Sequence, residues 1–358
     1  MVIEIDGSMG EGGGQILRVA LALSAVTGKP VKIFNIRAKR RNPGLQNQHL
    51  TAVRALATLT NARVEGAVLR STQLLFEPRG IRSGSFRFDV GTAGSVTLVL
   101  QSLIPVLPFA PGPVEVEIRG GTDVPWSPPV DYVRLVLIPL LREMGLELDL
   151  RVIRRGHYPR GGGIVRVTVR NPPGMLRPVD KVERGALRRI VGVSHAVRLP
   201  RHVAERQARS AEEVLRAANL GVPIDIDLEY YEKGRDPHLG PGSGVVLAAL
   251  AERSVLGADA LGARGKPAEE VGREAAEKLL EELRSGAALD RHAGDMLIPL
   301  AALARGRSCL RASSLTMHAL TMIKLVELVL GARVELLEGG EEGRPYTISV
   351  EGIGLTRG

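Results

Sequence analysis

The sequence contains little sulfur and few aromatic side chains. Cys309 is the only cysteine among 358 residues, so no internal disulfide can form. A structural zinc site is also disfavoured, because His157, His195, His202 and His238 show no metal-ligand spacing. Aromatic residues make up 3% of the chain, which argues against the base-stacking platform of many single-strand binders. We therefore expect any nucleic acid to be held by its phosphates and its end.

Long apolar runs are absent as well, although 44% of the residues are hydrophobic. No stretch is long enough to cross a bilayer, which favours a soluble globular protein without a membrane partner. Residues 1–6 alternate like a β-strand and do not resemble an export leader. We therefore expect a cytoplasmic protein with one large or two ordinary domains.

The basic residues are mostly arginine. Lys and Arg number 48 against 39 Asp and Glu, giving a net charge of +9, and only eight of the basic residues are lysine. Guanidinium groups match phosphate geometry, so this excess favours a polyanionic partner. Genomic bias or heat adaptation explains it equally well.

A glycine-rich tract, Gly10-Glu11-Gly12-Gly13-Gly14-Gln15, comes directly before the apolar run 16–26. Glycine lets a backbone approach an anion closely, and the helix that follows directs free N–H groups to the same place. Arg18 adds a positive charge one turn later, and Glu11 can hold a divalent cation beside a polyphosphate. No Gly-Lys-Ser/Thr follows, so this is not a Walker P-loop. The alternative is a glycine turn that leads into a core helix.

Three stretches of the chain share one layout, in which two amphipathic helices alternate with strands. The tetrapeptide Ala62-Arg63-Val64-Glu65 recurs as Ala332-Arg333-Val334-Glu335, each time after a helix end where a left-handed residue is expected. The pattern predicts an α/β fold of three repeated βαβαββ-like units with layered sheets. The predicted helices and strands are 14–26, 31–36, 46–60 and 63–68; then 93–107, 114–118, 132–144 and 146–152; then 296–304, 308–312, 315–330 and 333–337.

The segment 185–286 interrupts this layout. It ends in a helix pattern with Pro267 near the start, apolar residues at fourfold spacing and Gly286 just past the end. We interpret it as a smaller inserted α/β domain. The large domain then comprises residues 1–184 and 287–358.

His318 is the strongest single candidate for chemistry. It lies near the start of the last long helix, in Thr316-Met317-His318. A neutral imidazole is a good nucleophile toward phosphorus, and a helix N-terminus stabilises a phosphate placed there. The alternative is a buried histidine whose nitrogens are bound by the backbone.

A basic run, Arg37, Lys39, Arg40 and Arg41, follows the first inner strand, and Gln48 opens the next helix. Ligands collect at the C-terminal ends of strands in α/β sheets, so this run is a candidate phosphate clamp. A solvated basic loop is the alternative.

Two further polar residues allow two interpretations each. Asp295 opens the sixth predicted helix, either as its N-cap or as an acceptor for a ribose hydroxyl. Gln101, on the predicted helix 93–107, is ambiguous in the same way.

Several motifs together resemble the RNA 3'-terminal phosphate cyclase family, in order from the N-terminus to His318. They cover nearly the whole chain, so as a set they are highly specific. The motifs are Glu11-Gly12-Gly13-Gly14-Gln15-Ile16-Leu17-Arg18, Arg37-Ala38-Lys39-Arg40, Pro43-Gly44-Leu45, Gln48-His49-Leu50-Thr51-Ala52-Val53, Gly120-Gly121-Thr122-Asp123, Tyr158-Pro159-x-Gly161-Gly162-Gly163, Pro200-Arg201-His202-Val203-Ala204-Glu205-Arg206 and His318-x-x-Thr321.

The resemblance implies three repeated units plus an insert, and a reaction that uses ATP and Mg²⁺ or Mn²⁺. A histidine–AMP adduct forms, AMP passes to an RNA 3'-phosphate, and the 2'-hydroxyl closes a 2',3'-cyclic phosphate. Carried over by position, His318 is the nucleophile and Glu11 the metal ligand. The nucleotide-binding residues would be Arg18, Arg37, Arg40 and Gln48 at the phosphates, Gln101, His292, Ala293, Gly294, Asp295 (at the ribose) and Met296, and Pro128 on adenine.

Two positions depart from the family pattern. The family often has an aromatic residue where this chain has His292, and commonly Gln where it has Met296. The choice of ATP over GTP therefore stays open, as does the choice between monomer and homodimer. A non-catalytic, cyclase-like RNA-binding protein of ribosome assembly is the main alternative, and a transferase on the related enolpyruvyl transferase fold is a third. Retention of Glu11 and His318 favours the enzyme.

Overall fold

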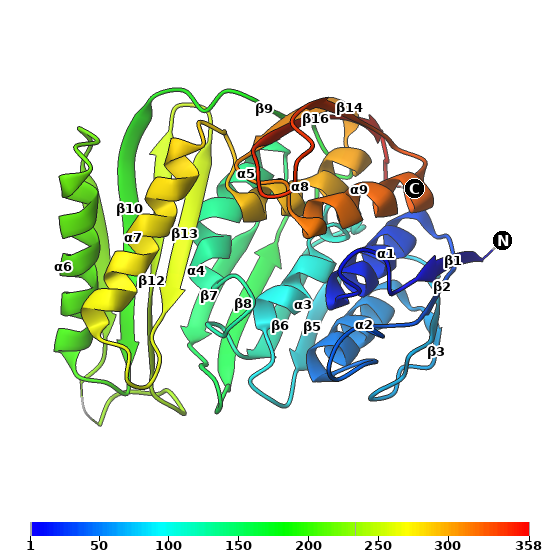
Figure 1. Ribbon diagram of the computed structural model, residues 1–358. Coiled ribbons are helices and arrows are strands. Elements are labelled where there is room, and N and C mark those ends of the chain that lie inside the picture. The colour runs from blue at the N-terminus through cyan, green and yellow to red at the C-terminus, as the bar shows by residue number, and fades with distance from the viewer. Residues whose placement is uncertain (1, 233, 358) are drawn as a thin grey trace.

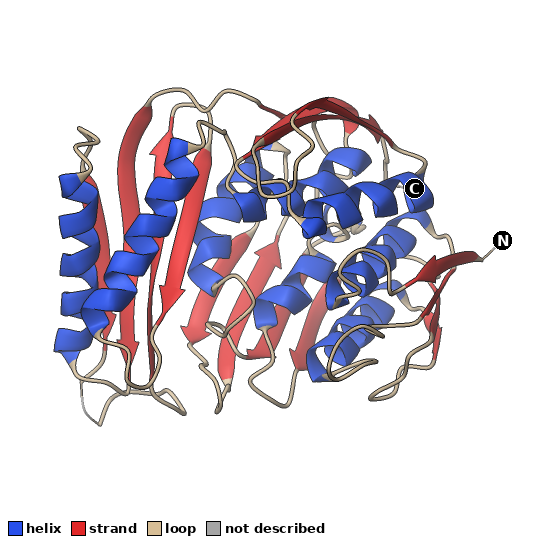
Figure 2. Ribbon diagram, in the orientation of Figure 1, coloured by secondary structure: helices blue, strands red, loops and turns tan. Residues whose placement is uncertain are grey.

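The computed structural model describes residues 2–232 and 234–357, and it is a mixed α/β protein with layered sheets, as predicted. Four four-stranded sheets lie toward the outside of the molecule, and most helices gather between them (Figure 1). Figure 2 shows the sheets as separate groups of strands with helices packed against one side. No helix in the described ranges is long and apolar enough to span a membrane.

Three of the sheets share one strand order. In each, the first strand is parallel to the second, and the remaining pairings are antiparallel. The first sheet contains β1 (Ile3–Asp6), β2 (Val31–Phe34), β4 (Leu74–Glu77) and β3 (Arg63–Glu65), in that order. The second contains β5 (Gly84–Asp89), β6 (Val114–Gly120), β8 (Gly163–Val169) and β7 (Asp149–Arg154). The third contains β9 (Asp180–Lys181), β14 (Arg305–Ala312), β16 (Tyr346–Ile353) and β15 (Arg333–Glu338).

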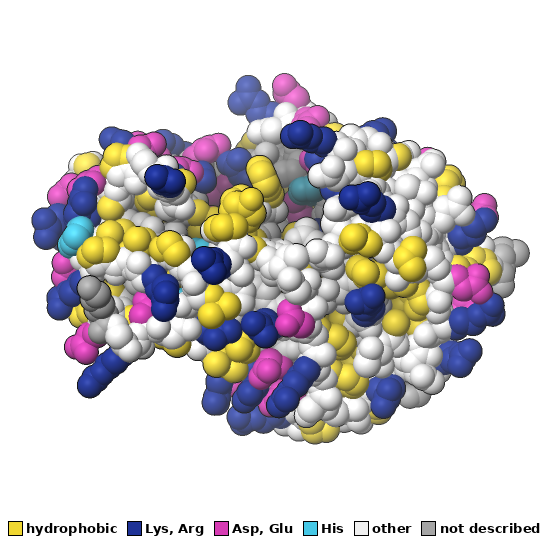
Figure 3. Space-filling model, turned by 90° about the horizontal axis from the view of Figure 1, so that it is seen from below, with side chains coloured by type: hydrophobic (Ala, Val, Ile, Leu, Met, Phe, Trp, Pro, Cys, Tyr) yellow, Lys and Arg dark blue, Asp and Glu magenta, His cyan; other side chains and the backbone are white. Residues whose placement is uncertain are grey.

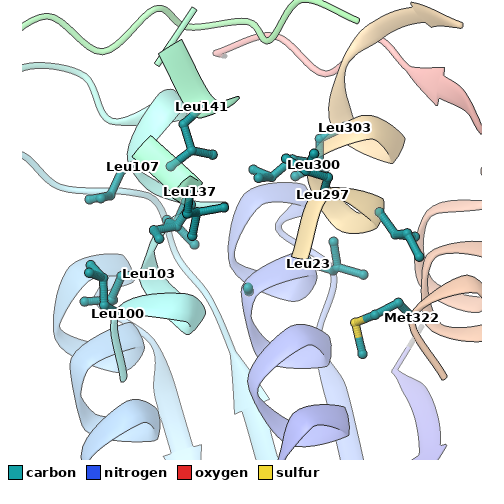
Figure 4. Close-up of a cluster of buried hydrophobic side chains, with 14 of the residues drawn as sticks. Leu23, Leu100, Leu103, Leu107, Leu137, Leu141, Leu297, Leu300, Leu303 and Met322 are labelled. Atoms are coloured by element: carbon teal, nitrogen blue, oxygen red, sulfur yellow. The ribbon is translucent and has the colours of Figure 1, made fainter. Parts of the chain in front are cut away.

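The helices of these three sheets meet in the centre and form one apolar core. Leu23, Leu100, Leu137, Leu297 and Met322 come from five different segments and lie in the same cluster (Figure 4). Each fully buried side chain of this size contributes about 1.5–3 kcal/mol. The helical segments are α1 (Gly14–Thr27), α2 (Asn47–Thr60), α3 (Val96–Leu103), η1 (Leu107–Phe109), α4 (Val130–Tyr132), η2 (Val133–Leu137), α5 (Ile138–Glu143), α8 (Arg291–Leu303) and α9 (Met317–Leu330).

The residues between β9 and α8 form the fourth sheet and its two helices. The face under its helices has a core of its own, which includes Ile190, Leu215, Val245 and Leu279. Val246, Ala248 and Val255 belong to the central core. The sheet order is β11 (Ile224–Tyr230), β10 (Leu187–Val197), β12 (Gly242–Ala251) and β13 (Val255–Leu261), covered by α6 (Arg201–Ala217) and α7 (Ala268–Arg284).

Capping residues explain where the helices begin and end. Asn61 and Gly331 adopt the expected left-handed conformation, with φ of 48° and 71°, before the two Ala-Arg-Val-Glu segments. The predicted start of α8 at residue 296 was wrong, because the helix begins at Arg291. Asp290 is its N-cap and accepts hydrogen bonds from the backbone N–H groups of His292 and Ala293. Residues 292–296 are therefore the first turns of a helix and not a loop.

Candidate active site

A cavity of about 390 Å³ brings together most of the residues predicted to bind a nucleotide. Seven of the predicted residues line it, although they lie far apart in sequence. Its lining residues are Gln15 and Arg18 from α1, Leu98 and Gln101 from α3, Trp126, Ser127 and Pro128 from the loop before α4, Asp259 from β13, Lys278 from α7, His292, Asp295 and Met296 from α8, and His318 from α9.

His318 is the second residue of α9, whose N-cap Thr316 accepts a hydrogen bond from the Ala319 N–H at 2.9 Å. Its side chain is 44% exposed, and Nδ1 lies 3.7 Å from Oε2 of Glu11. Burial lowers the pKa of His318, and Arg18 lowers it further, while Glu11 opposes both effects. The imidazole is therefore neutral at pH 7. Because Nδ1 faces Glu11, Nε2 is the nitrogen available to an electrophile.

The glycine-rich tract passes between His318 and the basic loop. Gly10 has φ of +50°, and a Cβ there would lie 2.4 Å from Oγ1 of Thr321 on α9. A Cβ on Gly14 would lie 2.1 Å from Nε2 of His49. The tract thus needs glycine because side chains of α9 and α2 pack closely against it. The predicted approach to a phosphate stays a prediction. It places Glu11 against His318 and also 2.8 Å from the Arg40 guanidinium.

Arg18 supplies positive charge to the cavity. Burial lowers its pKa to about 10, so the guanidinium stays charged at pH 7. Burial, followed by the charge of Arg18, lowers the pKa of His49 to about 3. His49 is therefore neutral, and its Nδ1 accepts a hydrogen bond from the Gln46 N–H at 3.2 Å as part of a capping box. Its role is to begin α2.

The first turns of α8 present Asp295 to the cavity. The Thr316 hydroxyl donates to Oδ1 of Asp295 at 2.8 Å, and burial raises the pKa of this carboxyl to about 8. The carboxyl is thus protonated in part at pH 7 and can both donate and accept hydrogen bonds. The interpretation of Asp295 as an N-cap was wrong, because Asp290 caps this helix.

His292 and Met296 flank Asp295 on α8. His292 packs edge-on against Tyr132, with ring centroids 5.9 Å apart, and burial lowers its pKa to about 4. The Gln101 amide nitrogen lies 3.7 Å from Sδ of Met296. Both positions that depart from the family pattern therefore face the cavity as neutral groups.

Six predicted residues do not line the cavity. Two of them, Glu11 and Arg40, pair with each other beside His318, and the other four make contacts within the fold. Ala293 and Gly294 are buried, and a Cβ on Gly294 would lie 2.5 Å from Cβ of Ala312, so they pack α8 on β14. Oε1 of Gln48 accepts a hydrogen bond from the Ser95 N–H at 3.0 Å. The Arg37 guanidinium donates to the carbonyls of its own loop, at residues 42 and 44.

Comparison with known proteins shows the family of this chain. The RNA 3'-terminal phosphate cyclase family matches residues 9–336. The chain belongs to this family. Three relatives named RNA 3'-terminal phosphate cyclase are similar over nearly their whole length. They come from Hyperthermus butylicus (67% identity, 98% of both chains), Ignicoccus hospitalis (57%, 98% of this chain and 99% of the relative) and Staphylothermus marinus (57%, 99% of both).

A solved structure, the enolpyruvyl transferase NikO from Streptomyces tendae, also matches. Its TM-score is 0.43 at 12% identity, over 100% of this chain and 50% of that chain. A likeness this low carries no inference about fold or function.

Sequence reasoning missed several residues that line the cavity of this cyclase-family protein, notably Trp126, Asp259 and Lys278. Burial raises the pKa of Asp259 to about 6, and Lys278 Nζ donates to the Asp259 carbonyl at 3.0 Å. Asp259 and Lys278 come from the fourth sheet and its helix, and no local sequence pattern indicates that β13 reaches the cavity. Trp126 is the only tryptophan, and it follows the family motif Gly120–Asp123 by three residues.

A second polar cluster, outside the cavity, joins the second and fourth sheets. The buried Arg155 guanidinium lies 3.2 Å from Asp123 and 2.6 Å from Glu229. Nε2 of His157 lies 2.9 Å from Nε2 of His195, and burial lowers both pKa values, so the histidines are neutral. Asp123, His157 and His195 place ligand atoms within 4.8 Å of one another, which their sequence spacing did not indicate. Arg155 pairs with Asp123, Asp131 and Glu229, so the cluster is explained as a network of ion pairs between the sheets.

Proposed function

We propose that this protein converts an RNA 3'-terminal phosphate to a 2',3'-cyclic phosphate, using ATP and a covalent adduct of AMP with His318. Family membership supports the overall reaction. The observation that carries the mechanism is the contact between Nδ1 of His318 and Glu11, at the N-terminus of α9 and in the same cavity as Arg18 and Asp295. A neutral imidazole held in this way is a nucleophile placed beside groups suited to a nucleotide.

Three displacements then follow in order. Nε2 of His318 attacks the α-phosphorus of ATP, so that a P–N bond forms, a P–O bond breaks and pyrophosphate leaves. An oxygen of the RNA 3'-phosphate attacks the same phosphorus, which breaks the P–N bond and creates a phosphoanhydride. The 2'-hydroxyl attacks the activated 3'-phosphorus, loses its proton and expels AMP. The last step is intramolecular and needs mainly orientation and charge neutralisation.

The residues of the chain serve these steps in different ways. Arg18 stabilises charge on the phosphates, and Asp295 hydrogen-bonds the ribose hydroxyls. Glu11 fits a divalent ion of the magnesium type, since such ions are commonly bound by one or two carboxylates together with substrate phosphates. When bound, Mg²⁺ or Mn²⁺ would neutralise phosphate charge. Arg40 holds the Glu11 carboxylate beside His318.

The test is incubation of the pure protein with α-labelled ATP and Mg²⁺ or Mn²⁺, without RNA. We expect an acid-labile, alkali-stable label on the protein that is absent in His318→Ala. His202→Ala is the matched control, because His202 is an exposed histidine on α6 outside the cavity. A label retained in His318→Ala would refute the assignment. No label under either metal would favour the non-catalytic RNA-binding alternative.

We also propose that the three sheets of common strand order are repeats and that residues 185–286 are an insertion. The strand order shared by three sheets and the second core, which the fourth sheet forms with its own helices, support this proposal. A fragment of residues 185–286 should unfold cooperatively in urea. A fragment without a cooperative transition would contradict the proposal.

A further inference from the structure

Among the described residues that line the cavity, Trp126 has the most exposed large side chain. It is 99% exposed and has φ of +63°, a conformation that bulky residues rarely adopt. An indole in this state buries no apolar surface and contributes nothing to the fold, although tryptophan is the residue with the most to gain from burial. Its exposure therefore needs a functional reason.

The loop that carries Trp126 is held in place on both sides. The Ser127 hydroxyl donates to the Val124 carbonyl at 3.1 Å, and the Thr97 hydroxyl donates to the Pro128 carbonyl at 2.7 Å. The indole thus projects into solvent from an anchored loop. A preorganised aromatic face loses little entropy when it binds a ligand.

Trp126 shares a cavity with His318, but the two ends of that cavity differ. Asp295 is 6% exposed and lies at the buried end, on α8. Trp126, fully exposed, stands at the mouth. A nucleotide that contacts Asp295 would fill the buried end and leave the part of the cavity beside Trp126 for a second substrate. On the face shown in Figure 3 the Lys and Arg side chains are scattered and do not form one strip.

We propose that Trp126 is a stacking platform for the terminal nucleobase of the RNA that carries the 3'-phosphate. This inference rests on the proposed function and adds a base subsite to it. Every nucleobase has a π-face, so one indole accepts any terminal base without reading sequence. The low aromatic content argues against an extended platform, whereas a single terminal base needs only one aromatic residue. Loss of one such stack weakens binding by roughly 5- to 150-fold.

The experiment uses the fact that Trp126 is the only tryptophan, so all tryptophan emission reports on this position. Titration of the full chain with a short RNA ending in a 3'-phosphate, without ATP or metal, should quench the emission. The same RNA with an abasic terminal nucleotide should quench much less. ATP alone should leave the emission nearly unchanged. Quenching by ATP alone that equals the RNA effect would overturn the proposal and assign the indole to adenine.

Kinetics give an independent readout. Trp126→Ala should raise the KM for RNA roughly 5- to 150-fold and at least fivefold more than the KM for ATP, while Trp126→Phe should restore most of the loss. Leu228→Ala is the control, because Leu228 is an exposed apolar residue on β11 outside the cavity, and it should leave both KM values unchanged. Equal changes in the two KM values, or no change in either, would overturn the proposal.

The two proposals fail separately. Quenching by RNA does not require histidine chemistry, so it should persist in His318→Ala. Label transfer to His318 without any RNA-dependent change in emission would refute only the base subsite. RNA quenching in a protein that never becomes labelled would refute only the histidine–AMP mechanism.

Discussion

Removing the Asp290 carboxylate should destabilise the fold and the site together. Its Oδ1 accepts hydrogen bonds from the Tyr132 hydroxyl at 2.6 Å and from the His292 and Ala293 N–H groups at 2.9 Å, and its Oδ2 accepts one from the Gly257 N–H at 2.8 Å. Each buried donor left without a partner costs about 1–3 kcal/mol. Burial raises the pKa of Asp290, so the cost of burying the carboxylate offsets part of the stabilisation that these hydrogen bonds give.

For Asp290→Ala we expect the free energy of unfolding to fall by about 3–6 kcal/mol, a large part of the 5–15 kcal/mol typical of proteins. Asp290→Asn should cost only about 0–2 kcal/mol, because its amide oxygen can replace Oδ1 and only the Gly257 N–H loses its acceptor. Urea unfolding at pH 7 measures both values. Self-labelling with ATP should fall with stability in the alanine variant, since Asp290 sets the first turn of α8. An alanine variant within 1 kcal/mol of wild type, or equal costs for Ala and Asn, would refute this reasoning.

Two other predictions concern pH and the basic loop. The pKa of Asp295 is about 8 in the folded protein against an ordinary 3.8, so the folded state keeps a proton that the unfolded chain loses. The unfolding free energy should therefore fall as pH rises from about 4 to 8, by at most about 1.4 kcal/mol per pH unit. Asp295→Asn should remove this slope. Equal unfolding free energies of the unmodified protein in urea at pH 5 and pH 8 would contradict the prediction. Arg37→Ala should lower the unfolding free energy by about 1–3 kcal/mol, because the Arg37 guanidinium donates to the carbonyls of Asn42 and Gly44. Arg40 is half-exposed, so Arg40→Ala should change the unfolding free energy by less than about 0.5 kcal/mol. Equal thermal shifts in the two variants would refute this contrast.

Much of the fold could be predicted from the sequence, because its helices carry their own start and stop signals. Gly28, Asn61 and Gly331 end three helices in the left-handed conformation, as their residue types indicate. The start of α8 could not be placed in this way. Gly294 looks like a helix breaker in sequence, but it lies inside the helix because α8 packs so closely on Ala312 that no Cβ fits. That requirement arises from tertiary packing, which the local sequence does not show.

The candidate site likewise contains some residues that the sequence could select and others that only the tertiary structure reveals. Glu11 and His318 lie near opposite ends of the chain, and the residue types and motifs selected both as candidates. The structure brings them to 3.7 Å of each other, while their roles stay a prediction. Asp259 and Lys278 gave no such sign, since their part in the cavity depends on how the fourth sheet docks. For Arg37, a basic residue in a loop predicts a ligand contact, and the structure shows in addition that one guanidinium nitrogen donates to the loop's own carbonyls. The predicted phosphate contact stays a prediction.

In the proposed mechanism His318 is a nucleophile that works beside a polyanion, and the charges around it suit this role. Phosphates that enter the cavity raise the pKa of a nearby imidazole and favour its protonated, unreactive form. Burial, Arg18 and Arg40 lower that pKa, while Glu11 alone raises it. A divalent ion on Glu11 would cancel the single opposing charge as the phosphates arrive. Under the proposed mechanism this arrangement would keep His318 neutral when a nucleotide binds, with the Glu11 carboxylate at Nδ1 and Nε2 left free.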